Sequence, residues 1–266
     1  MRLATFLLPG SSEPLAGEVR DERVVAFSAH PAPDGVRERL ASGDRTPASG
    51  PDYALAEVTL LAPVPQPRAI FGIGLNYAAH AAEGGKAAPS QPIVFFKQPG
   101  ASVAPSGPVR HPAVTSMLDY EAELAVVIGA DGQIGGFAVA DDVSARDLQR
   151  SEPQWVRAKG GDTFCPWGPW ITTADELSVS EAEDLQIRAW VNGELRQDSR
   201  TSDLIFGCQA CVDFIAESIA LQPGDLILTG TPSGVGVHMR PSRFLTPGDV
   251  VRIELERLGA IEHPVV

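Results

Sequence analysis

The sequence predicts an α+β fold that is mainly β. Short segments rich in β-branched and aromatic residues recur along the chain, and 26 glycines and 23 prolines punctuate them. Few segments have helical periodicity, which argues against a doubly wound sheet. With 266 residues, of which 44% are hydrophobic, the chain is long enough to bury a large core.

The first 62 residues predict a small α+β domain. Strands are expected at 4–8 and 23–27, a short helix at 36–40, and a polar loop at 41–52. Pro63, Pro65 and Pro67 then predict a stiff, extended connector. We therefore expect two domains, at 1–62 and 63–266.

The second domain should contain most of the strands. They are expected at 68–73, 93–97, 121–128, 137–142, 185–191, 226–230 and 250–255. Asn192-Gly193 predicts a hairpin turn, because both residues accept positive φ angles. Helices are expected at 77–83 and 203–220. The second helix carries Cys208 and Cys211 on its apolar face, so we interpret this pair as buried and not as a redox or zinc site.

Composition restricts the partners of the chain. The net charge is -13 with a pI of about 4.8, and no run of Lys and Arg interrupts it, so we expect no nucleic-acid partner. The apolar start of the chain is too short for a signal peptide, and no apolar run is long enough for a membrane span. The odd number of cysteines suits a reducing compartment, and we expect a cytoplasmic protein.

Acidic residues gather at the ends of two expected strands. Glu121 and Glu123 alternate along one strand and therefore share a face. An E-x-E pair alone is more typical of two solvated glutamates on an edge strand. Asp141-Asp142, at the end of the next strand, can supply a third carboxylate at the same end of the sheet. Oxygen-rich sites of this kind suit Mg²⁺, Mn²⁺ or Ca²⁺.

Several segments together resemble the fumarylacetoacetate hydrolase family. They occur in the family's order at 119–124 (DYEAEL), 142–149 (DVSARDLQ), 191–194 (VNGE), 228–236 (LTGTPSGVG) and 247–251 (PGDVV). The resemblance implies a mixed β-roll or β-sandwich core behind a small N-terminal domain, and a homodimer. It also implies one Mg²⁺ or Mn²⁺ bound by Glu121, Glu123 and Asp142.

The resemblance also assigns proton-handling groups. His80 and Glu83 lie three residues apart on one helical face, where a carboxylate can orient an imidazole. The residues alone are more typical of a surface His–Glu pair, but the family implies a dyad that activates water on a lid, and Gly84-Gly85 suits such a lid. Lys159 matches the family lysine that stabilises an enolate. A solvated loop lysine is the ordinary alternative.

Three further residues match substrate-binding positions. Arg146 can bind a carboxylate bidentately, although it could equally be a structural partner of Asp147. Gln149 matches a neighbouring contact. Thr231 offers a hydroxyl within a glycine-rich turn whose amides suit a carboxylate.

The chain departs from the family pattern at three positions. Asp141 stands where relatives often carry Asn, and would add negative charge beside the ion. Leu75 stands where relatives carry Arg, which removes a carboxylate anchor. Gly161 replaces a common Phe, which should alter the pocket wall.

The leading functional expectation is metal-dependent hydrolysis of a C–C bond in an acylpyruvate or related β-diketo or 2-oxo acid. The same site could instead support decarboxylation of oxaloacetate, or isomerisation or hydration of an unsaturated 2-oxo acid. A third hypothesis, from another class, is a catalytically silent accessory protein that binds a metal and a ligand.

Overall fold

The computed structural model describes residues 1–85 and 87–266. A large mixed sheet forms one layer, with the strand order β4-β3-β2-β1-β13-β11-β10-β16-β6-β7; β5 pairs with β1, and β8 with β13. Its strands are β1 (Arg2–Leu7), β2 (Leu15–Arg20), β3 (Arg23–Ala26), β4 (Asp52–Ala54), β5 (Thr59–Leu60), β6 (Ile70–Gly74), β7 (Ile93–Lys97), β8 (Ser102–Val103), β10 (Ala122–Ile128), β11 (Ile134–Asp141), β13 (Cys165–Thr173) and β16 (Leu226–Leu228).

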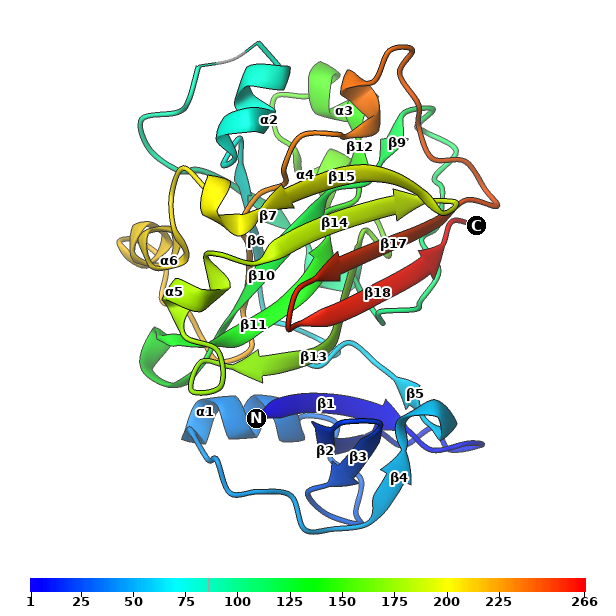
Figure 1. Ribbon diagram of the computed structural model, residues 1–266, viewed down its shortest axis with the longest axis vertical. Coiled ribbons are helices and arrows are strands. Elements are labelled where there is room, and N and C mark those ends of the chain that lie inside the picture. Colours follow the sequence, from blue (N-terminus) through cyan, green and yellow to red (C-terminus); the bar gives the residue numbers. More distant parts are fainter. Residues whose placement is uncertain (86) are drawn as a thin grey trace.

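A four-stranded antiparallel sheet packs across β10, β11 and β13 as the second layer (Figure 1). In spatial order, its strands are β15 (Glu194–Arg200), β14 (Gln186–Val191), β17 (Val250–Leu255) and β18 (Gly259–Pro264). A two-stranded ladder joins β9 (Leu118–Asp119) to β12 (Ser144–Ala145). The helices are α1 (Gly35–Ser42), α2 (Ala78–Glu83), α3 (Arg146–Ser151), α4 (Val156–Lys159), α5 (Val179–Ala182) and α6 (Cys208–Ala216). The expected α+β, mainly β class is confirmed.

The core lies between the two sheets. All seven residues of β10 are buried. Strands β14 and β17 cover one face of β10, and other parts of the chain cover the opposite face. This explains why β10 reads as a continuous apolar run after Glu123, a pattern typical of a strand buried on both faces. Two acidic side chains at the start of such a strand are therefore held in the interior.

The N-terminal strands continue the large sheet. β1 pairs antiparallel with β13, with Arg2 opposite Thr172, and Figure 1 shows these strands at one end of the molecule. They also enclose a separate small apolar cluster that includes Phe6 and Val24. The division of the chain at residue 62 stays a prediction.

The helix expected at 203–220 is wrong at both ends, since α6 spans only Cys208–Ala216. Asp203 lies in a 3-10 turn, η4 (Thr201–Asp203), where its carboxylate accepts a hydrogen bond from the Ala79 amide at 3.1 Å. Asn76 then binds the next residues, because its side-chain carbonyl accepts from the Phe206 amide at 2.8 Å. Tertiary hydrogen bonds therefore replace the first helical turns. Both cysteines of α6 are buried and unpaired, as expected.

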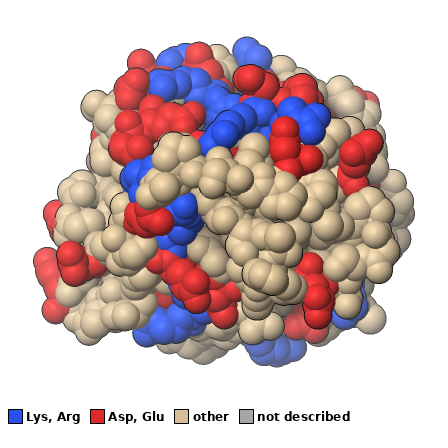
Figure 2. Space-filling model, turned by 90° about the horizontal axis from the view of Figure 1, so that it is seen from below, with Lys and Arg blue, Asp and Glu red and all other residues tan. Residues whose placement is uncertain are grey.

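Opposite charges alternate on the surface. Figure 2 shows basic and acidic side chains mixed on the face that carries the N-terminal strands. Several form ion pairs, such as Arg23–Asp52 at 2.8 Å and Arg45–Asp175 at 2.7 Å. No helix among the described residues is long and apolar enough to cross a membrane.

Candidate active site

Three carboxylates converge where β10 begins and β11 ends. Ala122 pairs with Asp141 in the antiparallel β10–β11 ladder, so Asp142 lies beside Glu121 and Glu123. The three side chains are buried, with exposed fractions of 4% for Glu121, 2% for Glu123 and 0% for Asp142. One oxygen from each lies within 4.8 Å of the others. The structure thus brings together the three expected ligand residues.

Three buried cations surround this carboxylate cluster (Glu121, Glu123 and Asp142). The Lys159 ammonium lies 2.5 Å from Asp142 Oδ2 and also contacts Glu121 Oε2. Lys97 lies 2.5 Å from the other Asp142 oxygen, and Arg146 Nη2 lies 2.6 Å from Glu121 Oε1. Lys159 is therefore buried, and the alternative of a solvated loop lysine does not describe it. Lys97 was not expected from the sequence.

The carboxylates differ in electrostatic environment. Burial alone would raise the pKa of Glu121, but Arg146 and Lys159 outweigh it and hold this pKa well below its usual range. Burial raises the pKa of Glu123 well above its usual range, and the charges of Asp142 and Glu121 add to the effect. Lys159 stays a cation, since Asp142 and Glu121 overcome the burial that would lower its pKa. Glu123 is the carboxyl for which an added cation would matter most.

The donor set fits a divalent cation. The buried acids at the site outnumber the buried Lys and Arg side chains by one; they are Asp119, Glu121, Glu123 and Asp142, against Lys97, Arg146 and Lys159. Buried like charges are costly unless a cation or a proton compensates them. Carboxylate oxygens select hard ions such as Mg²⁺ or Mn²⁺. The carboxylate cluster can therefore hold one such ion, while its role as a ligand set stays a prediction.

Helix α3 directs two expected substrate-binding residues toward the carboxylate cluster. Arg146 Nε donates to Asp119 Oδ2 at 2.8 Å, and Nη1 donates to Gln149 Oε1 at 3.1 Å. Asp147 is not a partner of Arg146, because its carboxylate accepts from the Thr115 hydroxyl at 2.6 Å. The suggested Arg146–Asp147 pairing is therefore wrong. Arg146 is instead anchored by acids within the site.

The glycine-rich turn, residues 230–236, is tied to the start of β10. The Gly230 amide donates to Glu123 Oε2 at 2.6 Å. Gln197 bridges the same elements, because its amide nitrogen donates to the Thr231 hydroxyl at 2.8 Å while its carbonyl accepts from the Ala122 amide at 3.0 Å. Thr231 consequently keeps its own hydroxyl proton for another acceptor. This suits the expected contact with a carboxylate.

The His80–Glu83 pair lies on α2 at the side of the pocket. His80 is only 7% exposed, so the surface-pair alternative does not describe it. Its Nδ1 lies 3.3 Å from Glu83 Oε2, and Glu83 Oε1 accepts a hydrogen bond from the Gly234 amide at 3.1 Å. Glu83 is thus fixed by the glycine-rich turn and in turn orients the imidazole.

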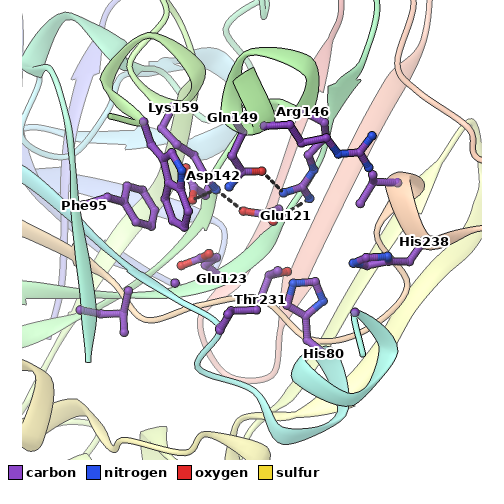
Figure 3. Close-up of a pocket in the computed structure, with 17 residues that line it drawn as sticks. His80, Phe95, Glu121, Glu123, Asp142, Arg146, Gln149, Lys159, Thr231 and His238 are labelled. Atoms are coloured by element: carbon purple, nitrogen blue, oxygen red, sulfur yellow. Dashed lines mark hydrogen bonds and ion pairs between the residues drawn. The ribbon is translucent and has the colours of Figure 1, made fainter. Parts of the chain in front are cut away.

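One pocket of about 370 Å³, a volume suited to a small ligand, is lined by the carboxylate cluster together with His80, Arg146, Gln149, Lys159 and Thr231. In Figure 3, His80 and Thr231 lie below Glu121, and Lys159, Gln149 and Arg146 lie above it. Further lining residues were missed by sequence reasoning, namely Phe95, Arg150, Trp155 and His238. Arg150 and Trp155 follow the matched 142–149 segment, but no local pattern marks His238.

The three departures from the family pattern have different outcomes. Leu75 lines the pocket and has a φ of 56°, a backbone conformation that residues other than glycine rarely adopt. Gly161 lies against the Phe164 ring and lines a separate hollow, and its effect on the pocket wall stays a prediction. Asp141 accepts from the Glu121 amide at 2.8 Å and lies 3.0 Å from His263 Nε2. Its charge is therefore directed to His263 and not to the carboxylate cluster.

Comparison with known proteins identifies the family. Residues 69–266 match the family described as "Fumarylacetoacetate (FAA) hydrolase C-terminal". The chain belongs to the fumarylacetoacetate hydrolase family. It is 40% identical to an oxaloacetate tautomerase of Xenopus laevis, covering 100% of this chain and 90% of the relative. The resemblance seen in the sequence is thus confirmed.

Solved structures of the fumarylacetoacetate hydrolase family share the whole fold. One is a 5-carboxymethyl-2-hydroxymuconate delta-isomerase from Mycobacterium smegmatis, with 36% identity, a TM-score of 0.81 and coverage of 100% and 99% of the two chains. Another is a fumarylacetoacetate hydrolase from Exiguobacterium antarcticum, with 32% identity, a TM-score of 0.87 and the same coverage. The named relatives are more often tautomerases or isomerases than C–C hydrolases. This favours isomerisation, one of the alternatives, over the leading expectation of C–C hydrolysis. The Xenopus relative is named as mitochondrial, and a cytoplasmic location stays a prediction.

Proposed function

We propose that this protein is a divalent-metal-dependent isomerase that interconverts the keto and enol forms of a small 2-oxo dicarboxylic acid of the oxaloacetate class. The observation that carries the proposal is a single pocket that combines a carboxylate cluster, an oriented imidazole and a guanidinium–amide pair. The names of the relatives favour isomerisation over C–C hydrolysis.

Glu121, Glu123 and Asp142 would hold the ion, Mg²⁺ or Mn²⁺. When bound, the ion would polarise the 2-oxo group and lower the energy of the enolate. Arg146 and Gln149 would bind one substrate carboxylate, and Thr231 would donate a hydrogen bond to substrate oxygen. Lys159 adds a fixed positive charge where negative charge develops.

His80 is the proposed proton carrier. Its Nδ1 faces Glu83, which leaves Nε2 as the nitrogen that can accept a proton from the carbon next to the 2-oxo group. The electron pair of the broken C–H bond forms the enolate C=C bond, and the oxygen gains a proton to complete the enol. No atom is lost or gained, so this reaction needs no water.

Solvent exchange followed by NMR tests the proposal. Oxaloacetate in D₂O should exchange its C3 protons faster with protein and Mg²⁺ than in the same Mg²⁺ buffer without protein. EDTA should remove the acceleration. The same samples, supplied with acylpyruvates, should show no C–C cleavage. Exchange at the buffer rate would contradict the proposal.

Hydrolysis is the second candidate, because an imidazole oriented by a carboxylate can also activate water. Cleaved acylpyruvate products would establish it, with solvent oxygen in the released acid. If neither reaction occurs in the presence of Mg²⁺, the hypothesis of a catalytically silent metal- and ligand-binding protein gains support. A homodimer also stays a prediction, to be tested by light scattering.

A further inference from the structure

A second group of metal-binding side chains lies beside the carboxylate cluster. His80, Glu83 and His238 each offer a ligand atom, and these atoms lie within 4.8 Å of one another. The group joins α2 to the 3-10 turn η5 (Gly236–His238), segments that are far apart in the sequence. Figure 3 shows the two imidazoles side by side at one side of the pocket.

The three side chains are held close together by their surroundings. The His80 and His238 ring centroids are 5.7 Å apart. A Cβ added at Gly84 would lie 3.4 Å from His238 Nε2, so this ring packs near the backbone at the end of α2. Glu83 accepts a hydrogen bond from the Gly234 amide of the glycine-rich turn and lies beside His80.

We propose that His80, Glu83 and His238 form a second cation site, selective for Zn²⁺, whose occupation inhibits the enzyme. Two imidazoles and one carboxylate are a typical zinc ligand set, and imidazole nitrogen favours Zn²⁺ over Mg²⁺. The oxygen-only carboxylate cluster has the opposite preference. The pocket therefore contains two sites that differ in ligand type.

The present spacing is close to that of a bound ion. Two ligands of a tetrahedral zinc lie about 3.4 Å apart, given bonds of about 2.0–2.1 Å. His80 Nδ1 and Glu83 Oε2 already meet this value at 3.3 Å. The zinc would replace the proton that these two atoms share. His238 also offers a ligand atom within 4.8 Å of the other two, so an approach of at most about 1.5 Å would complete a three-residue site.

Burial also keeps the His238 imidazole available as a ligand. It lowers the pKa of His238, against an opposing effect of Glu83. A neutral imidazole has the free nitrogen lone pair that a metal requires.

The inhibition follows from the proposed role of His80 and in that part rests on the proposed function. A zinc ion on His80 would occupy the imidazole that carries the proton. It would also fasten α2 to η5 at the side of the pocket. Binding itself does not depend on any reaction.

Equilibrium dialysis against Zn²⁺ in saturating Mg²⁺ tests the site without turnover. The wild-type chain should bind one more zinc ion than His238→Gln, and also one more than His80→Gln. His30→Gln, which changes an exposed histidine far from the pocket, should match the wild type. Equal zinc counts in wild type and His238→Gln would overturn the proposal.

Cobalt provides a second readout, because Co²⁺ bound by imidazoles has visible absorption bands. These bands should appear in the wild type and be lost in His238→Gln, while circular dichroism confirms that the variant is folded. In the exchange assay, the half-inhibitory Zn²⁺ concentration should rise at least tenfold in His238→Gln. If the zinc counts differ as expected but no exchange activity exists, the site stands and the proposed function fails.

Discussion

The Lys97 ammonium lies 2.5 Å from Asp142 Oδ1, and neither side chain has any exposed surface. The same ammonium donates to the Val143 carbonyl at 3.2 Å. Lys97 therefore fixes one oxygen of Asp142, and the other oxygen accepts a hydrogen bond from Lys159. An edge-strand lysine thus positions a proposed metal ligand.

Replacing Lys97 with Met should destabilise the protein by about 3–5 kcal/mol, because it leaves the buried Asp142 charge without this partner. Urea unfolding at neutral pH measures the change. Arg23→Met is the matched control, since it breaks an exposed ion pair with Asp52 and should cost at most about 1 kcal/mol. Equal losses in both variants would refute the positioning role of Lys97.

Glu123→Gln should abolish Mg²⁺ binding while the chain remains folded. Burial, Asp142 and Glu121 raise the pKa of Glu123, so the neutral amide relieves repulsion when no ion is present. We expect Mg²⁺ to raise the melting temperature of the wild type and to leave that of Glu123→Gln unchanged. Glu13→Gln, an exposed control, should behave as the wild type. A Mg²⁺-dependent shift in Glu123→Gln would remove this residue from the ligand set.

The sequence was sufficient to predict the strands that carry the carboxylates, because alternation and the apolar run of 124–128 mark them clearly. β13 was missed, since Pro166 and Pro169 interrupt a segment that would otherwise be expected as a strand. Pro169 falls where the ladder with β11 shifts register between Phe137 and Val139, and Pro166 pairs with Val103 of the short strand β8. A proline is therefore weaker evidence against a strand where the strand pairing is irregular.

Side chains that act through tertiary placement could not be predicted. Lys97 ends an apolar strand, and a lysine there is ordinarily solvated; only the packing of β7 beside the pocket buries it. His238 similarly has no local pattern, because only the placement of η5 brings it to the pocket; Arg150 directly follows the matched 142–149 segment, but nothing in the sequence marks it as a lining residue. Family resemblance located the carboxylate cluster but not these neighbours.

His80→Gln should reduce the Mg²⁺-dependent exchange rate by about 10²–10⁴-fold, the usual contribution of a general base. Magnesium binding by calorimetry should be unchanged, because His80 is not part of the carboxylate cluster. Glu83→Gln should reduce the rate less, since the imidazole remains and loses only its orienting carboxylate. An exchange rate in His80→Gln equal to that of the wild type would exclude His80 as the proton carrier.

Arg150→Ala should raise KM for oxaloacetate about tenfold with little change in kcat, as expected for a group that binds substrate and transition state alike. Arg150 is exposed, lines the pocket and follows Gln149 on α3, where it can meet the distal carboxylate of a dianion. Pyruvate, which lacks that carboxylate, should show no such effect on its binding. Arg157→Ala is the control, because Arg157 pairs with Glu152 at 2.6 Å outside the pocket.

The cysteines should be unreactive in the folded protein. Burial raises the pKa of Cys165 to about 12 and that of Cys211 to about 12, and it also raises the pKa of Cys208. At pH 8 an ordinary cysteine is roughly one-quarter thiolate, whereas a thiol with a pKa of 12 is about one part in ten thousand. Iodoacetamide should therefore leave the native chain unmodified at pH 8 and alkylate three cysteines in urea.

The raised thiol pKa values also fix the sign of a pH dependence. Above about pH 8.5 the unfolded chain loses thiol protons that the folded chain keeps, so the unfolded state binds fewer protons. The contribution of the thiols to the free energy of unfolding is complete below that pH and is lost as the pH rises toward 12. Urea midpoints should fall between pH 8.5 and 10.5, and the fall should be smaller in Cys165→Ala relative to its own value at pH 7. An identical decline in both proteins would show that Cys165 does not titrate on unfolding as its burial requires.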